Sequence, residues 1–234
     1  MSEASEKVTG IEQLPIFPLP LVLMPYELLP LHIFEPRYRQ MLKDIELRRN
    51  LFGINLFEPQ SEYDEKPKPG TVGCVAEVKQ SQTLPDERSN IVTFGLIRYR
   101  LIDFVDAGTP YFSARVEFFE DDPEPAEVLA PIAEAVFTLF ERVAKAAFKL
   151  SGNRGRLPEV PRAAPEQLSF LVAAAFNLDN ELKLQFIEFT STSKRLENLK
   201  GILEQAVTQM ESNAELFSVA QKNGHSKKEI DLGP

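Results

Sequence analysis

One cysteine and two histidines are the residues of this 234-residue chain that could pair a nucleophile with a base or hold a soft metal. Cys74 lies in the run VGCVAEV, between small and apolar neighbours, and His32 lies in an apolar extended segment. A catalytic thiol needs a nearby base that lowers its pKa, and one Cys with His32 and His225 makes no zinc ligand set by spacing. We interpret Cys74 and His32 as packed core or strand residues, and we expect no catalytic residue, no metal and no cofactor.

Carboxylates are more numerous, and eight of them lie between Glu117 and Glu141 with no Lys or Arg among them. A calcium loop places its acids at alternating positions around a glycine, whereas the run EFFEDDPEPAE contains prolines instead. A solvated acidic turn is the favoured interpretation. A docking surface for a basic partner, centred on Asp121 and Asp122, is the alternative.

Two further catalytic signatures are missing from the sequence. It has no G-x-x-x-x-G-K-[ST] loop to hold phosphates and no G-x-S-x-G nucleophile elbow.

The run Glu35-Pro36-Arg37-Tyr38 could be mistaken for a site. We interpret it as a strand-to-helix corner fixed by the proline, with Arg37 pairing a nearby carboxylate.

Composition narrows the class of partner and compartment. The net charge of -9 and the pI of about 5.0 disfavour DNA, RNA and an anionic membrane as main partners. A single cysteine cannot form an internal disulfide, which favours a reducing compartment. The polar, acidic start MSEASEKVTGIE has neither the basic and apolar regions of a signal peptide nor the character of a transit peptide, so we expect a cytoplasmic protein.

The rest of the chain is expected to be organised around residues 14–38, which are apolar from residue 14 to residue 34 apart from Glu27, Tyr26 and His32. Five prolines in this stretch exclude a membrane helix, because each removes a backbone donor that lipid cannot replace. They divide the stretch into extended pieces over residues 16–24 and 28–34. We expect later segments to bury these pieces, with Phe34 among the core residues.

The order of strand-like and helix-like segments along the chain predicts an α+β protein. Residues 36–45 have helical spacing, and residues 71–79, 90–99, 100–105 and 111–119 read as strands of a strongly bent antiparallel sheet or small barrel. Gly53, Gly73 and Gly95 mark bends or close backbone approaches. After residue 120 the apolar spacing becomes helical, and Asp179 is a plausible N-cap for a helix over residues 180–189. The domains are then a flexible lead-in over residues 1–12, a β-rich part over 13–120, a helical part over 121–220 and a disordered tail over 221–234.

Several short motifs, in order along the chain, carry a family resemblance. They are LPLVLMP, LPLHIFEPRY and FGI, followed by GCVAE, LPD, Gly95, Arg98 and Pro110-Tyr111, and finally by QLSFLVA and KRL. Together they cover about residues 14–207, and this pattern resembles the N-terminal substrate-binding domain of Lon proteases. The resemblance implies a PUA-like β pseudobarrel that leads into a helical bundle.

The resemblance also implies a function, because the ATPase and Ser-Lys peptidase modules of a full Lon protease are not in this sequence. We expect a stand-alone, non-catalytic module of the kind found in bacteria, including cyanobacteria, and in plastid relatives. It would bind polypeptide segments or a partner protein as an adaptor or scaffold. A PUA-like binder of RNA or of a small molecule, with a basic patch at Arg98, Arg100 and Arg115, is one alternative. A peptidase-associated hydrolase with an unrecognised site is another.

Partner contacts are expected where the β-rich and helical parts meet. Lon-type domains read extended or unfolded polypeptide, and tyrosine and arginine are favoured at such contacts because they bury area while keeping a polar group. The predicted contact residues are Tyr26, Tyr63, Arg98, Tyr99 and Arg100, with Asp121 and Asp122 as the acidic alternative. The competing interpretation is that the tyrosines are ordinary aromatic residues at strand ends.

Overall fold

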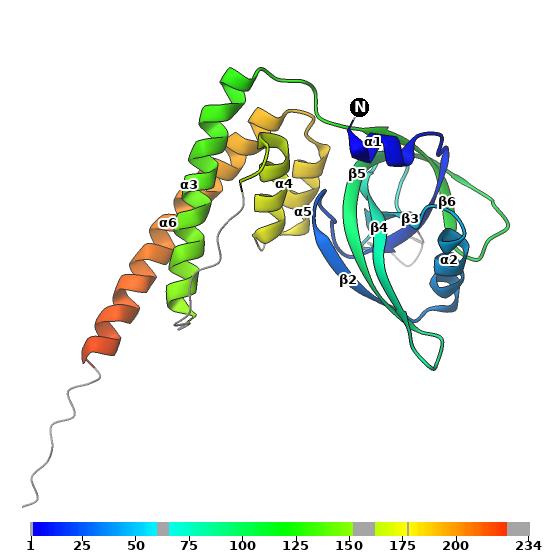
Figure 1. Ribbon diagram of the computed structural model, residues 1–234, viewed down its shortest axis with the longest axis horizontal. Helices are drawn as coiled ribbons and strands as arrows, with labels where there is room; N and C mark the ends of the chain where they lie inside the picture. Colours follow the sequence, from blue (N-terminus) through cyan, green and yellow to red (C-terminus); the bar gives the residue numbers. More distant parts are fainter. Residues whose placement is uncertain (1, 60–65, 152–161, 177, 224–234) are drawn as a thin grey trace, which may run out of the picture. The chain divides into compact units, whose positions relative to one another are not determined.

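The computed structural model describes residues 2–59, 66–151, 162–176 and 178–223. It is α+β, as expected, with six strands and six helices (Figure 1). The strands are β1 (Gln13–Leu19), β2 (Leu28–Ile33), β3 (Leu51–Leu56), β4 (Val72–Thr83), β5 (Ser89–Val105) and β6 (Phe112–Phe119). The helices are α1 (Glu3–Val8), α2 (Pro36–Glu46), α3 (Ala126–Leu150), α4 (Pro165–Ala175), α5 (Asn180–Glu188) and α6 (Thr192–Asn223).

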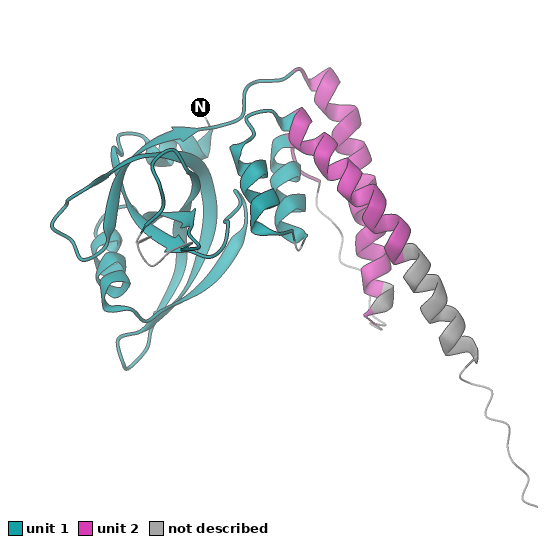
Figure 2. Cartoon of the chain, turned by 180° about the vertical axis from the view of Figure 1, so that it is seen from behind, with its two compact units in different colours: residues 1–124, 166–192 teal, residues 125–165, 193–234 magenta. Residues whose placement is uncertain are grey.

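The chain divides into two compact units, each of which is built from two segments (Figure 2). The first unit comprises residues 1–124 and 166–192, and therefore holds the sheet together with α1, α2, α4 and α5. The second comprises residues 125–165 and 193–234, and holds α3 and α6. In the second unit, α3 buries Val136 and Val143, while α6 buries Leu196, Leu199 and Leu203.

The domain boundaries expected from the sequence differ from this division. Residues 166–192 belong with the strands and not with the long helices, because α4 and α5 bury Phe170 and Phe186 almost completely. The expected flexible lead-in contains helix α1, which Ser2 caps by accepting a hydrogen bond from the Ser5 N–H, and Val8 at its end is 4% exposed. Helix α6 continues to Asn223, and the remainder of the expected disordered tail lies outside the described residues.

A ring of strands forms the centre of the first unit. Strand β1 pairs in parallel with β3 and antiparallel with β6, while β4 joins β3 to β5 and β5 returns to β6, which closes the ring. Two register shifts between β4 and β5 and one between β5 and β6 interrupt the pairing. Such irregularities bend strands and raise their twist, and this lets the 17-residue β5 take part in the ring along one half only.

The other half of β5 carries an extension that we call the β2 wing. It consists of β2, residues 89–94 of β5 and residues 77–83 of β4, paired antiparallel in the order β2-β5-β4. The connection between β4 and β5 is short, because β4 continues to Thr83 and β5 begins at Ser89, each extending beyond the strand expected from the sequence. Helix α2 follows β2 directly and starts with Pro36 in its first turn, as predicted.

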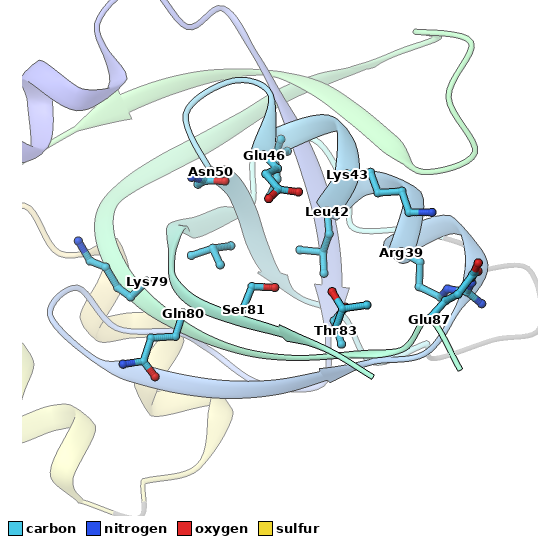
Figure 3. Close-up of a pocket in the computed structure, with 13 residues that line it drawn as sticks. Arg39, Leu42, Lys43, Glu46, Asn50, Lys79, Gln80, Ser81, Thr83 and Glu87 are labelled. Atoms are coloured by element: carbon cyan, nitrogen blue, oxygen red, sulfur yellow. The ribbon is translucent and has the colours of Figure 1, made fainter. Parts of the chain in front are cut away.

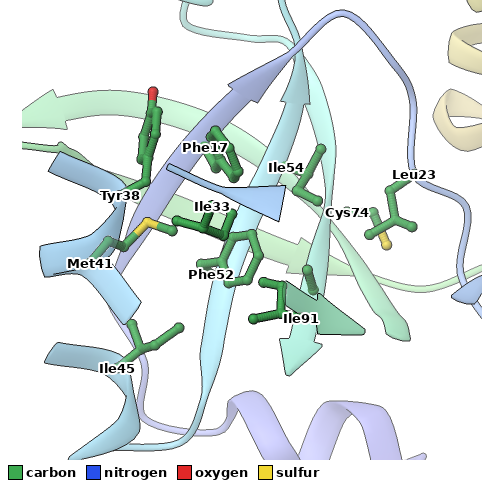
Figure 4. Close-up of a cluster of buried hydrophobic side chains, with 11 residues drawn as sticks. Phe17, Leu23, Ile33, Tyr38, Met41, Ile45, Phe52, Ile54, Cys74 and Ile91 are labelled. Carbon is green, nitrogen blue, oxygen red and sulfur yellow. The ribbon is translucent and has the colours of Figure 1, made fainter. Parts of the chain in front are cut away.

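Apolar side chains fill the space between α2, the wing and the ring (Figure 4). Phe52 and Met41 are fully buried, and the Tyr38 ring lies 4.0 Å from the Phe17 ring. Phe34 is a correction to the sequence-based expectation, since it is 58% exposed. Residues 14–38 are therefore buried through Phe17, Leu23 and Ile33. Phe34, which directly follows β2, faces solvent.

Candidate functional site

Arg98 lies in the interior of the first unit, where it joins β5 to the end of α5. Its Nη2 lies 2.6 Å from Oδ1 of Asp121, and the two side chains are 2% and 4% exposed. Nη1 donates to the carbonyl oxygens of Ile187 at 3.1 Å and Phe189 at 2.5 Å, at the C-terminal end of α5. A guanidinium placed there satisfies carbonyls that the helix leaves unpaired. Arg98 thus fixes α5 against the ring and presents almost no surface to a partner.

Tyr99, the next residue, points into the ring and is fully buried. Its hydroxyl donates to Oδ1 of Asn55, and burial raises the pKa of the phenol well above its usual value. A Cβ added at Gly53 or Gly73 would overlap the Tyr99 ring, so the two glycines leave the space that this ring occupies. The expected close backbone approach is confirmed at Gly73, which faces the Ile54 carbonyl, whereas Gly53 faces side chains. Tyr99 presents no surface to a partner.

The acidic turn is bound to the chain after α5 and is not freely solvated. Besides pairing with Arg98, Asp121 accepts a hydrogen bond from the Thr192 hydroxyl. The Asp122 carboxylate accepts a hydrogen bond from the Thr190 hydroxyl at 2.7 Å, and the Asp122 N–H donates to the Thr190 carbonyl at 2.8 Å. The expectation of a solvated turn is wrong for Asp121. Within the described parts of the chain, no group of three or more His, Cys, Asp or Glu side chains could hold a metal ion.

Three of the predicted contact residues come together near α4, and the others do not join them. Tyr26 has a positive φ of 67° and a half-buried ring, 6.3 Å from Phe94 and 6.4 Å from Phe170 of α4. Burial raises the pKa of Tyr26, and so do the nearby carboxylates of α4 and of the acidic turn. Tyr26, Arg98 and Asp121 therefore line one contact between the ring and α4–α5. Arg100 is exposed and donates to the Gly70 carbonyl at 3.0 Å, while Tyr63 lies outside the described residues.

Cys74 and His32 do not form a nucleophile–base pair. Cys74 is 1% exposed among core side chains, and burial raises the pKa of its thiol far above the range of a reactive thiolate. His32 is a strand residue and not a core residue. It lies on the solvent face of β2, with Nδ1 2.7 Å from Oδ1 of Asn90 and its ring stacked 6.1 Å from Phe34.

The outer face of the β2 wing is the surface feature that sequence reasoning missed. Leu28, the first residue of β2, and Phe34, which directly follows the strand, are 63% and 58% exposed. Between them Pro30 and His32 are also exposed, whereas Leu29, Leu31 and Ile33 turn inwards. A hollow of about 490 Å³ lies beside them on the wing, lined in part by Pro30, His32 and Val92. The two-residue periodicity of a strand indicates that β2 has two different faces. Because both faces carry apolar residues, the sequence does not indicate which of them is exposed.

The inner face of the wing borders a second hollow, of about 450 Å³, on the side of α2 (Figure 3). Leu42, Ile45 and Val78 supply its apolar side chains. Charged residues of both signs surround them, namely Arg39, Lys43, Glu46, Lys79 and Glu87. Arg39 forms an ion pair with Glu87, which lies beyond the end of β4. The two hollows therefore flank the wing on opposite faces, and both have mixed or neutral linings.

The free edge of β2 completes this geometry. In the part of the chain that the structure describes, β2 pairs with β5 on one side and with no strand on the other. Its exposed apolar residues and its unpaired backbone thus lie along one border of the wing. None of the described helices is long and apolar enough to cross a membrane.

Comparison with known proteins then places this fold. The family model of the ATP-dependent protease La (LON) substrate-binding domain matches residues 13–205, which include the whole ring, the wing and α4–α5. The chain belongs to the Lon substrate-binding domain family. This match confirms the resemblance expected from the sequence motifs, and the ring of strands agrees with the expected pseudobarrel.

Relatives of this Lon-type domain include proteins named Lon protease. The Lon protease of Syntrophus aciditrophicus is 26% identical over 222 residues, covering 91% of this chain and 27% of the relative. The Lon protease of Dictyoglomus thermophilum is 25% identical and is covered to the same 27% of its length. The chain therefore spans about a quarter of the length of these relatives.

Solved structures show the same fold. A Lon N-terminal domain protein from Xanthomonas campestris aligns with a TM-score of 0.60 and 21% identity, covering 81% of this chain and 97% of that one. The N-terminal domain of the Mycobacterium avium complex Lon protease aligns with a TM-score of 0.59 and 16% identity, over 84% and 98% of the two chains.

The Lon motif LPLHIFEPRY has a structural explanation in this chain. It forms β2, the corner and the start of α2, so it builds the wing. Arg37 Nε donates to Glu35 at 2.9 Å across the corner, which confirms the expected pairing. Gly95 lies where a Cβ would overlap the Met24 carbonyl, and its N–H donates to the Glu27 carbonyl at 2.9 Å. The glycine lets the turn before β2 cross closely over β5.

Proposed function

We propose that this Lon-type domain is a non-catalytic recognition module that binds extended or unfolded polypeptide, as an adaptor or scaffold. The observation that carries the proposal is the exposed apolar outer face of β2, with Leu28 63% and Phe34 58% exposed beside a hollow of about 490 Å³. Leu28, Pro30 and Phe34 give this face its apolar character, and exposed apolar patches mark interaction sites in folded proteins. Membership of a substrate-binding family supports the same role.

The charges around the wing favour a polypeptide over a nucleic acid. Arg37 pairs with Glu35, Arg39 with Glu87 and Arg88 with Asp86, so these three cations beside the wing are neutralised locally. Two of the three cations in the basic patch considered from the sequence are also paired with carboxylates. Arg98 is buried against Asp121, and Arg115 Nε donates to Asp103 at 2.7 Å. An RNA-binding surface needs uncompensated cations facing the phosphates, so these pairings weigh against the RNA alternative.

The hydrolase alternative finds no support in the described residues. Cys74 is sealed in the core with a raised thiol pKa, and His32 stands on the outside of β2. A covalent mechanism needs the nucleophile and its base within hydrogen-bond reach of each other.

The function is tested with a protein probe that exists in folded and unfolded forms. Fluorescence anisotropy would compare native α-lactalbumin with the same protein reduced and carboxamidomethylated, which keeps it unfolded without adding charge. We expect saturable binding of the unfolded form only, changing less than about threefold between roughly 0.05 and 0.3 M salt, since no phosphate-type counterion release is involved. Equal binding of both forms, or of neither, would contradict the proposal.

Matched variants then locate the surface. Leu28→Ser and Phe34→Ser should each weaken binding, because each removes an exposed apolar side chain of the wing. Leu47→Ser is the control, since Leu47 is 88% exposed but lies just beyond the end of α2. Undiminished binding by both wing variants would place the binding surface elsewhere on the chain.

A further inference from the structure

The backbone N–H and carbonyl groups of β2 point alternately towards β5 and towards the free edge of the wing. Residues 28–33 of β2 face residues 94–89 of β5 in antiparallel register. Just before β2, the Glu27 carbonyl accepts from the Gly95 N–H. Because both backbone groups of a residue in an antiparallel strand point to the same side, Leu29, Leu31 and Ile33 continue this bonding towards β5.

The even-numbered residues then direct their backbone groups to the free edge. Pro30 fits this assignment, since proline within a sheet occurs where its missing N–H faces away from the neighbouring strand. The edge therefore offers N–H donors at Leu28 and His32 and carbonyl acceptors at Leu28, Pro30 and His32. Their side chains are exposed on the outer face, so the donors, acceptors and apolar groups share one border.

We propose that this edge binds an extended, uncharged polypeptide segment as an added β-strand of the wing. The inference rests on the proposed function and specifies how that function is carried out at the same site. Backbone pairing at an exposed sheet edge gives affinity with little demand on sequence, and alternate side chains of the added strand contact the outer face. Leu28 and Phe34 would contact apolar residues of the segment. The local pairing of Arg37, Arg39 and Arg88 favours an occupant without charge.

Pro30 limits the strength of this edge. A long edge with all its donors would also pair with other copies, and proline is one means by which edge strands avoid this. The edge keeps one N–H donor on each side of Pro30, at Leu28 and at His32. Two donors suit a short segment that binds reversibly. The affinity of the site should therefore respond to each edge donor that is removed or added.

Variants at two edge positions change the backbone donors in opposite directions. His32→Pro removes a donor, and His32→Ala is its matched control because it loses the same imidazole but keeps the N–H. Pro30→Ala adds a donor. The probe is a neutral, acetylated and amidated nine-residue peptide of alternating valine and threonine, measured by isothermal titration calorimetry.

We expect His32→Pro to bind about three- to tenfold more weakly than His32→Ala, and Pro30→Ala to bind more tightly by a similar factor, as one hydrogen bond predicts. The same peptide N-methylated on two successive central residues blocks both of its own edges. It should bind wild-type protein at least about tenfold more weakly. This comparison leaves the protein unaltered, so it holds even if a variant folds poorly.

Three outcomes would overturn strand addition. The first is equal affinity of the methylated and unmethylated peptides, and the second is equal affinity of His32→Pro and His32→Ala. The third is dimerisation of the wild-type protein that peptide does not compete away, because the edge would then belong to a second copy. If unfolded α-lactalbumin still binds in these cases, the recognition function stands and only its mode is wrong. Loss of all binding to wild-type protein would instead contradict the function itself.

Discussion

Arg98 and Asp121 form an ion pair between β5 and the end of β6, with Nη2 and Oδ1 2.6 Å apart and almost no solvent contact. The Arg98 guanidinium also lies 4.6 Å from the centre of the Phe119 ring and 5.2 Å from that of Phe170. Its remaining donors bind the Ile187 and Phe189 carbonyls. One side chain thus holds three elements of the first unit together.

Breaking this pair from one side should be costly. Arg98→Met is expected to lower the free energy of unfolding by about 3–5 kcal/mol, because it leaves Asp121 as a buried charge without its partner cation. The measurement is urea denaturation followed by circular dichroism. Arg100→Met is the control on the same strand, and its exposed side chain predicts a change within about 0.5 kcal/mol. A loss of under about 1 kcal/mol for Arg98→Met would contradict the structural role of the pair.

Two phenylalanines allow the buried core and the exposed outer face to be tested separately. Phe52→Ala should destabilise the fold by about 3–5 kcal/mol, since its ring is fully buried in the core. Phe34→Ala should cost no more than about 0.5 kcal/mol, because its ring is mostly exposed. Denaturant midpoints of the two variants test this directly, and similar midpoints would place both rings in one environment.

Gly53 gives a prediction that depends on the Tyr99 ring. Gly53→Ala should destabilise by about 1–3 kcal/mol or more, because the added methyl group would overlap Tyr99 and Leu14 inside the ring of strands. Gly201→Ala is the matched substitution in open space, within α6. It should stabilise by about 0.5–1 kcal/mol, as alanine does in a helix interior. Thermal denaturation of the two variants should therefore shift in opposite directions.

Glu27 makes stability depend on pH with a defined sign. Burial raises the pKa of its carboxyl above the ordinary 4.5, although the Met24 N–H donates to Oε2 at 2.8 Å. The folded protein therefore binds a proton more readily than the unfolded chain does. Because of this linkage, the contribution of Glu27 is most favourable at low pH and is lost as the pH rises from about 4.5 through the folded-state pKa.

Glu27→Gln removes this titration while keeping an oxygen that can accept from Met24. The difference in unfolding free energy, variant minus wild type, should increase as the pH rises from about 4.5 to 7. Urea denaturation at a series of pH values checks it. A difference that is constant across this range would show that the carboxyl titrates alike in the folded and unfolded states.

Local signals in the sequence predicted the local structure well. Pro36 begins α2, and Asp179 caps α5 by accepting from the Leu182 N–H at 2.8 Å. Both depend on neighbours within a turn of helix, which the sequence displays directly. The motif resemblance reached further, because an ordered set of motifs specifies a whole fold.

The long-range chemistry of the candidate site was not predictable in the same way. An arginine in a strand is normally exposed, and Arg98 is buried only because its partners come from positions 23 and 89 residues away. β2 is apolar on both faces, so its alternation leaves open which face lies inside. The pairing of β2 with β5 decides this, and it places Phe34 and His32 outside.

The division of the first unit into residues 1–124 and 166–192 also bears on synthesis. On a ribosome that adds about 5–20 residues per second, Phe189 follows Arg98 by 91 residues, or on the order of ten seconds. Once residue 119 has been added, every strand of the ring has been made, yet the guanidinium still lacks the Ile187 and Phe189 carbonyls. The ring of the nascent domain therefore stays without α5 and its contacts to Arg98 until that segment has been synthesised.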